Sequence, residues 1–141
     1  MPSKVVAALL AALSLLVIGI GPVASAKSGP DIGSRAVIIR IHHSHFNQDV
    51  IVVRRGRAVH FVIVNDDPID HEFIIGDEAV QLRHEKGTEN QHGEVPGEVS
   101  VGALSRATTS YVFRGAEHMT FACHLPGHFA YGMHGKIRYL P

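Results

Sequence analysis

The chain has 141 residues, which is enough for one ordinary domain and too few for two. Its 13 Lys and Arg balance 13 Asp and Glu, so we expect neither nucleic acid nor an anionic membrane surface as a partner. The sequence contains 11 histidines but a single cysteine and no tryptophan. Histidine is the commonest metal ligand among side chains, so this excess is consistent with a metal-binding protein.

The first 26 residues are typical of a secretory signal peptide. Lys4 precedes an apolar run over residues 5–20, and Ala24-Ser25-Ala26 provides a cleavage signal. The run is shorter than the ~20 residues of a comfortable membrane span, so an uncleaved anchor is the weaker alternative. We therefore expect export to the periplasm or the exterior, with no stable membrane association after cleavage. Residues 27–35 predict a flexible lead-in, and a single domain should cover residues 36–141.

The predicted domain consists mainly of short strands. β-branched runs separated by turn residues at this interval predict an all-β sandwich or barrel. Gly56 should be the pivot of a turn between two of these runs. The expected strands cover residues 36–41, 50–53, 58–64, 71–75, 99–101, 108–113, 119–122 and 136–140.

A polar segment over residues 76–95 interrupts the strands and predicts a short helix or loop insertion at residues 77–95. Residues 77–86 predict one helix with Asp77 as its N-cap. The segment is too long for a hairpin loop, and such connections are usually functional or mobile. It carries His84, Glu89 and His92, which could form a secondary, solvent-facing metal site.

Another cluster of histidines precedes the second expected strand. This cluster could form another metal site. For it and for the cluster in the insertion, the competing interpretation is that these are polar surface residues without a role. The cluster consists of His42, His43 and His45.

The strongest functional signal is a Cys-x4-His-x4-Met motif formed by Cys123, His128 and Met133. A lone cysteine in an exported protein is either a reactive thiol or a ligand. A thiolate, two imidazoles and a long axial thioether define the blue-copper electron-transfer site. We predict His71 as the remaining ligand, because it begins a strand directly after a turn-rich loop. The competing interpretation is an inert thiol, a surface histidine and a core methionine.

The mature chain resembles the small cupredoxins, the group of azurin, plastocyanin and auracyanin. Its ligand loop has the spacing of auracyanin-like members, and the resemblance extends from about residue 36 to the C-terminus. It implies a Greek-key β-sandwich with one type 1 copper ion, equatorial ligands His71, Cys123 and His128, and axial Met133. Many cupredoxins have asparagine or serine after the first histidine, tying that strand to the cysteine loop, and this chain has Glu72 there.

The resemblance implies a one-electron carrier between extracytoplasmic redox partners, and we expect a monomer that is not an enzyme. A transient partner should dock on an apolar patch around the solvent-facing ligand. The alternative is a protein for copper storage, delivery or resistance with additional histidine-rich sites. The docking patch is expected to consist of His128, Leu125, Pro126, Phe129, Ala130 and Tyr131.

A multicopper oxidase is a further alternative, because His124 directly follows the cysteine as it does in those enzymes. Ala122, however, stands where they have a histidine, and the chain has one His-x-His pair where a trinuclear centre needs several. The sequence therefore disfavours an oxidase.

Overall fold

The computed structural model describes residues 36–87, 92–115 and 118–141. The predicted signal segment, the predicted lead-in and Glu89 lie outside the described residues. None of the helices in the described part of the chain is long and apolar enough to cross a membrane.

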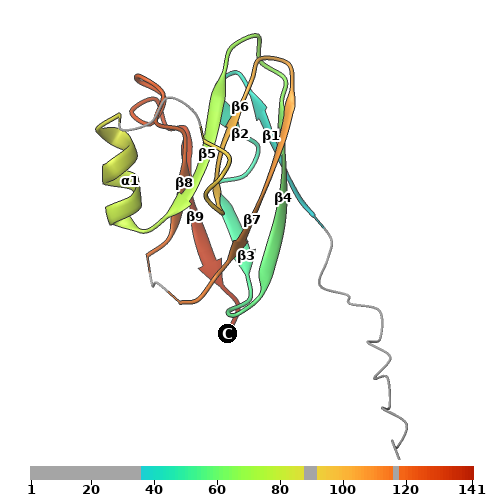
Figure 1. The fold of residues 1–141 in the computed structure, drawn as a ribbon, viewed down its shortest axis with the longest axis vertical. Helices are drawn as coiled ribbons and strands as arrows, with labels where there is room; N and C mark the ends of the chain where they lie inside the picture. The colour runs from blue at the N-terminus through green and yellow to red at the C-terminus, as the bar shows by residue number, and fades with distance from the viewer. Residues whose placement is uncertain (1–35, 88–91, 116–117) are drawn as a thin grey trace, which may run out of the picture.

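The described residues form two β-sheets that pack face to face, which confirms the predicted all-β sandwich (Figure 1). Most strands lie within two residues of their predicted bounds, and β2 was not predicted. One sheet has the order β2-β1-β4-β7 and the other the order β3-β9-β8-β5-β6. The strands are β1 (Val37–His42), β2 (His45–Phe46), β3 (Val50–Val53), β4 (Ala58–Asn65), β5 (His71–Gly76), β6 (Glu98–Val101), β7 (Arg106–Val112), β8 (Thr120–Ala122) and β9 (His134–Tyr139).

The hydrophobic core lies between the sheets and follows the alternation of the strands. On β4, Phe61 and Ile63 are fully buried, whereas Ala58 and His60 are exposed. Burying one such large side chain stabilises the fold by roughly 1.5–3 kcal/mol. Four aromatic rings, Phe46, Phe61, Phe73 and Phe121, contact one another in this core.

Close packing also fixes the chain around the cysteine loop. Phe121 on β8 is paired across the sheet with Gly135 on β9. A Cβ atom on Gly135 would lie 2.1 Å from the Phe121 ring and 2.8 Å from the backbone oxygen of Asp49, so glycine is required there. This contact holds the strands that precede and follow the Cys-x4-His-x4-Met motif.

Helix α1 (Glu78–Glu85) lies on the outer face of the sheet that contains β5 and β8 (Figure 1). Its N-cap is Asp77, as predicted, and the Asp77 carboxylate accepts a hydrogen bond of 3.1 Å from the Val80 amide. The helix lies so close to the strand that a Cβ atom at position Gly76 would be only 2.3 Å from the Val80 side chain. With the core on one face of β5 and the helix on the other, every residue of this strand is buried, including Glu72.

Candidate metal centre

Three of the four predicted copper ligands come together in the structure. The Cys123 sulfur lies 3.2 Å from His128 Nδ1, and His71 Nδ1 lies 3.3 Å from the same nitrogen. All three donor atoms lie within 4.8 Å of one another. They meet because His71 begins β5 and Cys123 follows the end of its antiparallel neighbour β8.

Met133, the predicted axial ligand, is fully buried next to the cysteine. The Cys123 amide donates to the Met133 carbonyl at 3.0 Å, and the Met133 amide donates to the His128 carbonyl at 3.0 Å. Gly127 and Gly132 have φ values of 84° and 94°, the left-handed conformation that the two tight turns of the loop require. Main-chain hydrogen bonds therefore hold the loop in this conformation.

The imidazole of His71 is oriented by Asp67, a residue that sequence reasoning missed. His71 Nε2 lies 3.0 Å from Asp67 Oδ2, which leaves Nδ1 facing the other donors. A carboxylate on the far nitrogen is the usual support of a metal-ligating histidine. The signal in the sequence was an aspartate four residues before the histidine, inside a segment that we interpreted simply as a turn.

Two backbone amides hold the Asp67 carboxylate in place. The amides of His43 and Ser44 each donate to it at 2.7 Å. Burial alone would raise the pKa of Asp67, but the hydrogen bonds from these amides and from His71 outweigh it and lower the pKa. Asp67 is therefore an ionised acceptor at neutral pH.

The turn at residues 42–45, which contains one of the two predicted histidine clusters, presents these two backbone amides to Asp67. His43 and Ser44 have φ values of 50° and 55°, a conformation that is costly for residues other than glycine. Within the described residues, the predicted set of His42, His43 and His45 is not among the groups of three donor atoms that converge on one point.

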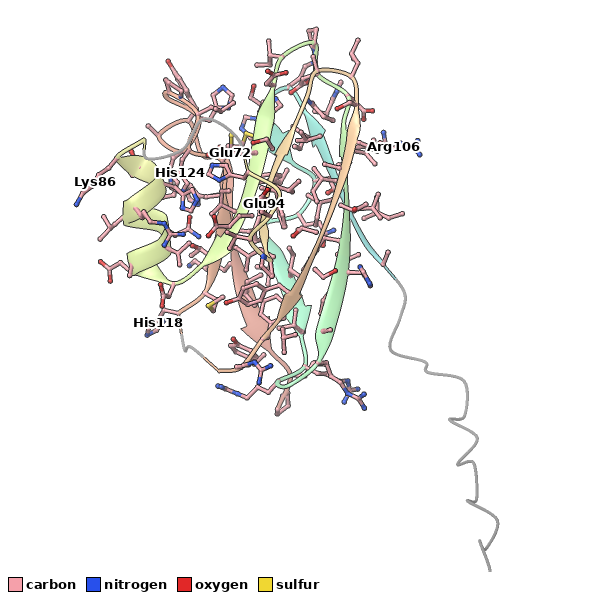
Figure 2. All side chains as sticks on the ribbon, viewed as in Figure 1. Glu72, Lys86, Glu94, Arg106, His118 and His124 are labelled. Carbon is pink, nitrogen blue, oxygen red and sulfur yellow. The ribbon has the colours of Figure 1, made fainter. Side chains whose placement is uncertain are left out.

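Glu72 connects the strand of the first histidine to the cysteine loop. Its amide donates to the Cys123 sulfur at 3.4 Å, and its carboxylate accepts a hydrogen bond of 2.7 Å from the His124 amide. Figure 2 shows Glu72 and His124 between helix α1 and the sheet. Glu72 thus makes the connection that the resemblance assigns to asparagine or serine.

The donor set fits copper. Imidazole nitrogens and a cysteine sulfur, with a methionine close to them in the chain, are the ligands of type 1 sites. The model of a family described as copper binding proteins, plastocyanin/azurin family, matches residues 36–139. The chain belongs to this family.

Curated relatives of this cupredoxin carry the name copper-resistant cuproprotein CopI. The protein from Rubrivivax gelatinosus is 38% identical over 65% of this chain, and the one from Pseudomonas aeruginosa is 26% identical over 91% of it. The chain spans 58% of the length of the Rubrivivax protein and 95% of the Pseudomonas protein.

Solved structures of auracyanins have the same fold as this cupredoxin. Auracyanin B has a TM-score of 0.61 at 17% identity and covers 75% of this chain and 88% of its own. The auracyanin of Roseiflexus castenholzii has a TM-score of 0.62 at 18% identity and covers 77% of this chain and 100% of its own. These comparisons confirm the cupredoxin-like sandwich.

The environment of the cupredoxin's donors determines their protonation. Burial raises the pKa of the Cys123 thiol to about 11, although amides of Leu125 and Glu72 oppose the shift. Burial lowers the pKa of His71, with the nearby Asp67 acting against it. Without a metal, the thiol is therefore protonated at neutral pH and His71 is neutral, so a metal must displace the thiol proton.

This protonation state predicts the pH dependence of copper binding. Because one thiol proton is released for each Cu(II) bound, the affinity should rise about tenfold per pH unit between pH 7 and 9, below the thiol pKa. Competition with a chelator of known pH dependence would measure it. An affinity that does not change over this range would show that the thiolate is not a ligand.

The secondary cluster in the cupredoxin is more buried than predicted. The side chains of His84 and His92 are only 2% and 3% exposed, so the expectation of a solvent-facing site was wrong. They are buried on the side of the sheet where helix α1 packs against β5. Among the described residues, which do not include Glu89, Glu98 at the start of β6 joins the two histidines, and its donor atom lies within 4.8 Å of theirs. No sequence signal distinguished Glu98, since its neighbours indicated a plain strand.

Proposed function

We propose that this protein binds one type 1 copper ion and acts as a one-electron carrier outside the cytoplasm. The ligands would be His71, Cys123 and His128, with Met133 in the axial position. The observation that carries the proposal is the convergence of three soft or borderline donor atoms within 4.8 Å. Bound copper would supply a Cu(II)/Cu(I) couple, which this ligand set accommodates in both oxidation states. The signal-like sequence at residues 1–26 supports export.

The chain's own contribution is to keep the donors in one geometry. Asp67 fixes the ring of His71, and the Glu72 amide fixes the sulfur of Cys123. Both ligand side chains are buried at 0–1% exposure, which keeps water away from them. A site that needs little rearrangement between charge states is suited to electron transfer.

A redox titration of the purified copper-loaded protein tests this proposal. We expect one electron per copper, with complete return of the visible spectrum on reoxidation. Loss of copper on reduction, or a spectrum that does not return, would contradict a role as an electron carrier.

Copper tolerance is a second candidate function, favoured by the names of the relatives from Rubrivivax and Pseudomonas. A strain that lacks this gene should then grow more poorly as copper rises, while its growth without added copper stays unchanged. A pure electron carrier would instead show a defect that does not depend on added copper. Several labile copper ions per chain would favour storage or delivery.

Met133→Leu tests the axial role. Leucine has a similar volume, so the buried position should tolerate it. Because the axial bond is weak, we expect copper to stay bound while the reduction potential and the colour change. Spectroscopy and voltammetry of the variant would measure both, and complete loss of copper would show that Met133 is not a weak ligand.

The surface around His128 supports the predicted docking patch, which remains a proposal. Pro126 and Ala130 are exposed, and Tyr131 is 80% exposed. Transient redox partners use small interfaces of this kind.

Tyr131→Glu should slow electron self-exchange between oxidised and reduced copies of the protein. Two patches that face each other would then each carry a negative charge, which we expect to slow exchange on the order of tenfold at low salt. NMR line broadening in mixtures of the two forms measures the rate. Ile38→Glu, on the exposed face of β1, changes the net charge equally and is the matched control. Equal rates in the two variants would place the electron-transfer surface elsewhere.

A further inference from the structure

We propose that His84, His92 and Glu98 form a second metal site, which binds a divalent cation such as Zn²⁺ or Cu²⁺ independently of the type 1 site. His84 lies at the end of helix α1, His92 in the segment that follows it and Glu98 at the start of β6. Their side chains are 2%, 3% and 4% exposed.

The distances suit one ion. His84 Nε2 lies 3.1 Å and His92 Nδ1 lies 3.8 Å from Glu98 Oε2, and no two of the three donor atoms are more than 4.8 Å apart. Ligand atoms of a tetrahedral zinc site, each ~2.1 Å from the metal, lie ~3.4 Å from one another. The separations between the donor atoms would therefore need to change by at most about 1.4 Å.

Each imidazole is held in the orientation of a metal ligand. His84 Nδ1 lies 2.8 Å from the Val80 carbonyl, which can only accept, so this nitrogen carries the hydrogen. In the neutral ring the lone pair of Nε2 then faces Glu98. His92 Nε2 lies 3.3 Å from the Glu72 carboxylate, which leaves Nδ1 facing the same oxygen. These outer contacts are the ones that orient metal-ligating histidines.

The carboxylate is supported in the same way. Arg83 donates to Glu98 Oε1 at 2.7 Å, which directs Oε2 towards the two imidazoles. Two imidazole nitrogens and a carboxylate oxygen converge in this buried place, and a divalent cation would take the place of the hydrogen between His84 and Glu98. Two nitrogens and one oxygen suit zinc or Cu²⁺, in contrast to the sulfur-containing type 1 set.

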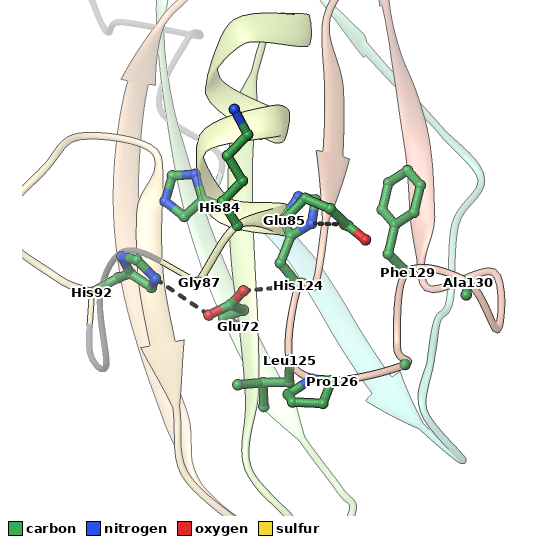
Figure 3. A pocket seen from close by; sticks show the side chains of 12 residues that line it. Glu72, His84, Glu85, Gly87, His92, His124, Leu125, Pro126, Phe129 and Ala130 are labelled. Carbon is green, nitrogen blue, oxygen red and sulfur yellow. Dashed lines mark hydrogen bonds and ion pairs between the residues drawn. The ribbon is translucent and has the colours of Figure 1, made fainter.

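An entry path leads to the site. A cavity of about 540 Å³ is lined by His84, His92, Glu72 and His124 (Figure 3). Its far wall is formed by the loop that follows the cysteine, including Phe129. A hydrated ion can reach the two histidines from this cavity, and water can complete its coordination.

Titration of the copper-loaded full chain tests the proposal. With the type 1 site filled, calorimetry with ZnCl₂ should reveal one further equivalent of bound Zn²⁺. A parallel titration with CuSO₄, followed by electron paramagnetic resonance, should add a second Cu²⁺ signal without the thiolate band. Because Cu²⁺ exceeds Zn²⁺ in the usual affinity order, copper should displace the zinc.

Three single variants locate the ion: His84→Gln, His92→Gln and Glu98→Gln. Each should weaken binding of the second equivalent at least tenfold. His60→Gln, an exposed histidine on β4, is the matched control and should leave it unchanged. The type 1 absorption of each variant shows whether its fold is intact. A variant that lost this absorption would be set aside, and the other two variants would test the site. Absence of a second equivalent, or its retention in all three variants, would overturn the proposal and leave a cluster of ion pairs.

Discussion

Cys123→Ser should abolish the intense visible absorption of the copper-loaded protein. The band is a charge transfer from thiolate to copper, and a serine hydroxyl supplies neither the soft donor nor an ionised oxygen at neutral pH. The exchange places a hydroxyl in a fully buried position, at a cost of about 1–3 kcal/mol, so the fold should survive it. Absorption spectroscopy measures the loss of the band, and a thermal melt of the metal-free variant measures the loss of stability. Metal analysis shows whether copper stays bound.

Met119→Leu is the matched control for this experiment. It also removes a buried sulfur, because Met119 is 4% exposed in the core, but that sulfur is not a predicted ligand. The control should keep the band and the copper. A band that persists in Cys123→Ser would mean that the chromophore does not involve the cysteine.

Asp67→Ala should weaken copper binding about 10–100-fold, which is the usual effect of removing the partner of a ligating histidine. His71 would lose the carboxylate that orients its ring, and the amides of His43 and Ser44 would lose their acceptor. Each buried donor left without an acceptor costs about 1–3 kcal/mol, so the metal-free variant should also be less stable. Chelator competition and urea unfolding measure the two effects.

Asp66→Ala separates this role from the simple loss of a negative charge. Asp66 is adjacent in sequence but partly exposed, and its partner is Arg40 on the surface. Such exposed ion pairs contribute about 0–1 kcal/mol, so both copper affinity and stability should change little. If the two variants bind copper equally, Asp67 does not position His71.

The strands could be predicted because they are β-branched runs bounded by turn residues. Val50–Val53 is an example, where the prediction and β3 agree at both ends. β2 (His45–Phe46) could not be predicted, because two residues carry no periodicity and the strand is defined by its pairing with β1. Long-range pairing, rather than local preference, determines such short elements.

The insertion shows what a local pattern cannot reveal. Helix α1 has no apolar stripe, and we expected the segment to face solvent. It docks instead through polar contacts, because the Gln81 amide donates to the carbonyls of Ile74, Gly76 and Thr120 at 3.3–3.4 Å. The close contact between Gly76 and Val80 adds to this packing. Burial of the two histidines follows from these contacts, which join segments far apart in the sequence.

The proposed copper ligands were predictable to the extent that they share one loop. Spacing alone connects Cys123, His128 and Met133, and His71 followed from its place at the start of a strand. Asp67 and Glu98 escaped prediction because their importance arises from side chains that the fold brings to them. A residue that supports a ligand has no characteristic spacing from it in the sequence, so no motif identifies it.

X-ray absorption at the copper edge of the singly loaded protein tests the central claim most directly. The account predicts one short copper–sulfur contact and two imidazole nitrogens, with one of these nitrogens lost in His71→Ala and regained on addition of imidazole. A first shell made of nitrogen and oxygen alone, or one that is unchanged by His71→Ala, would contradict it.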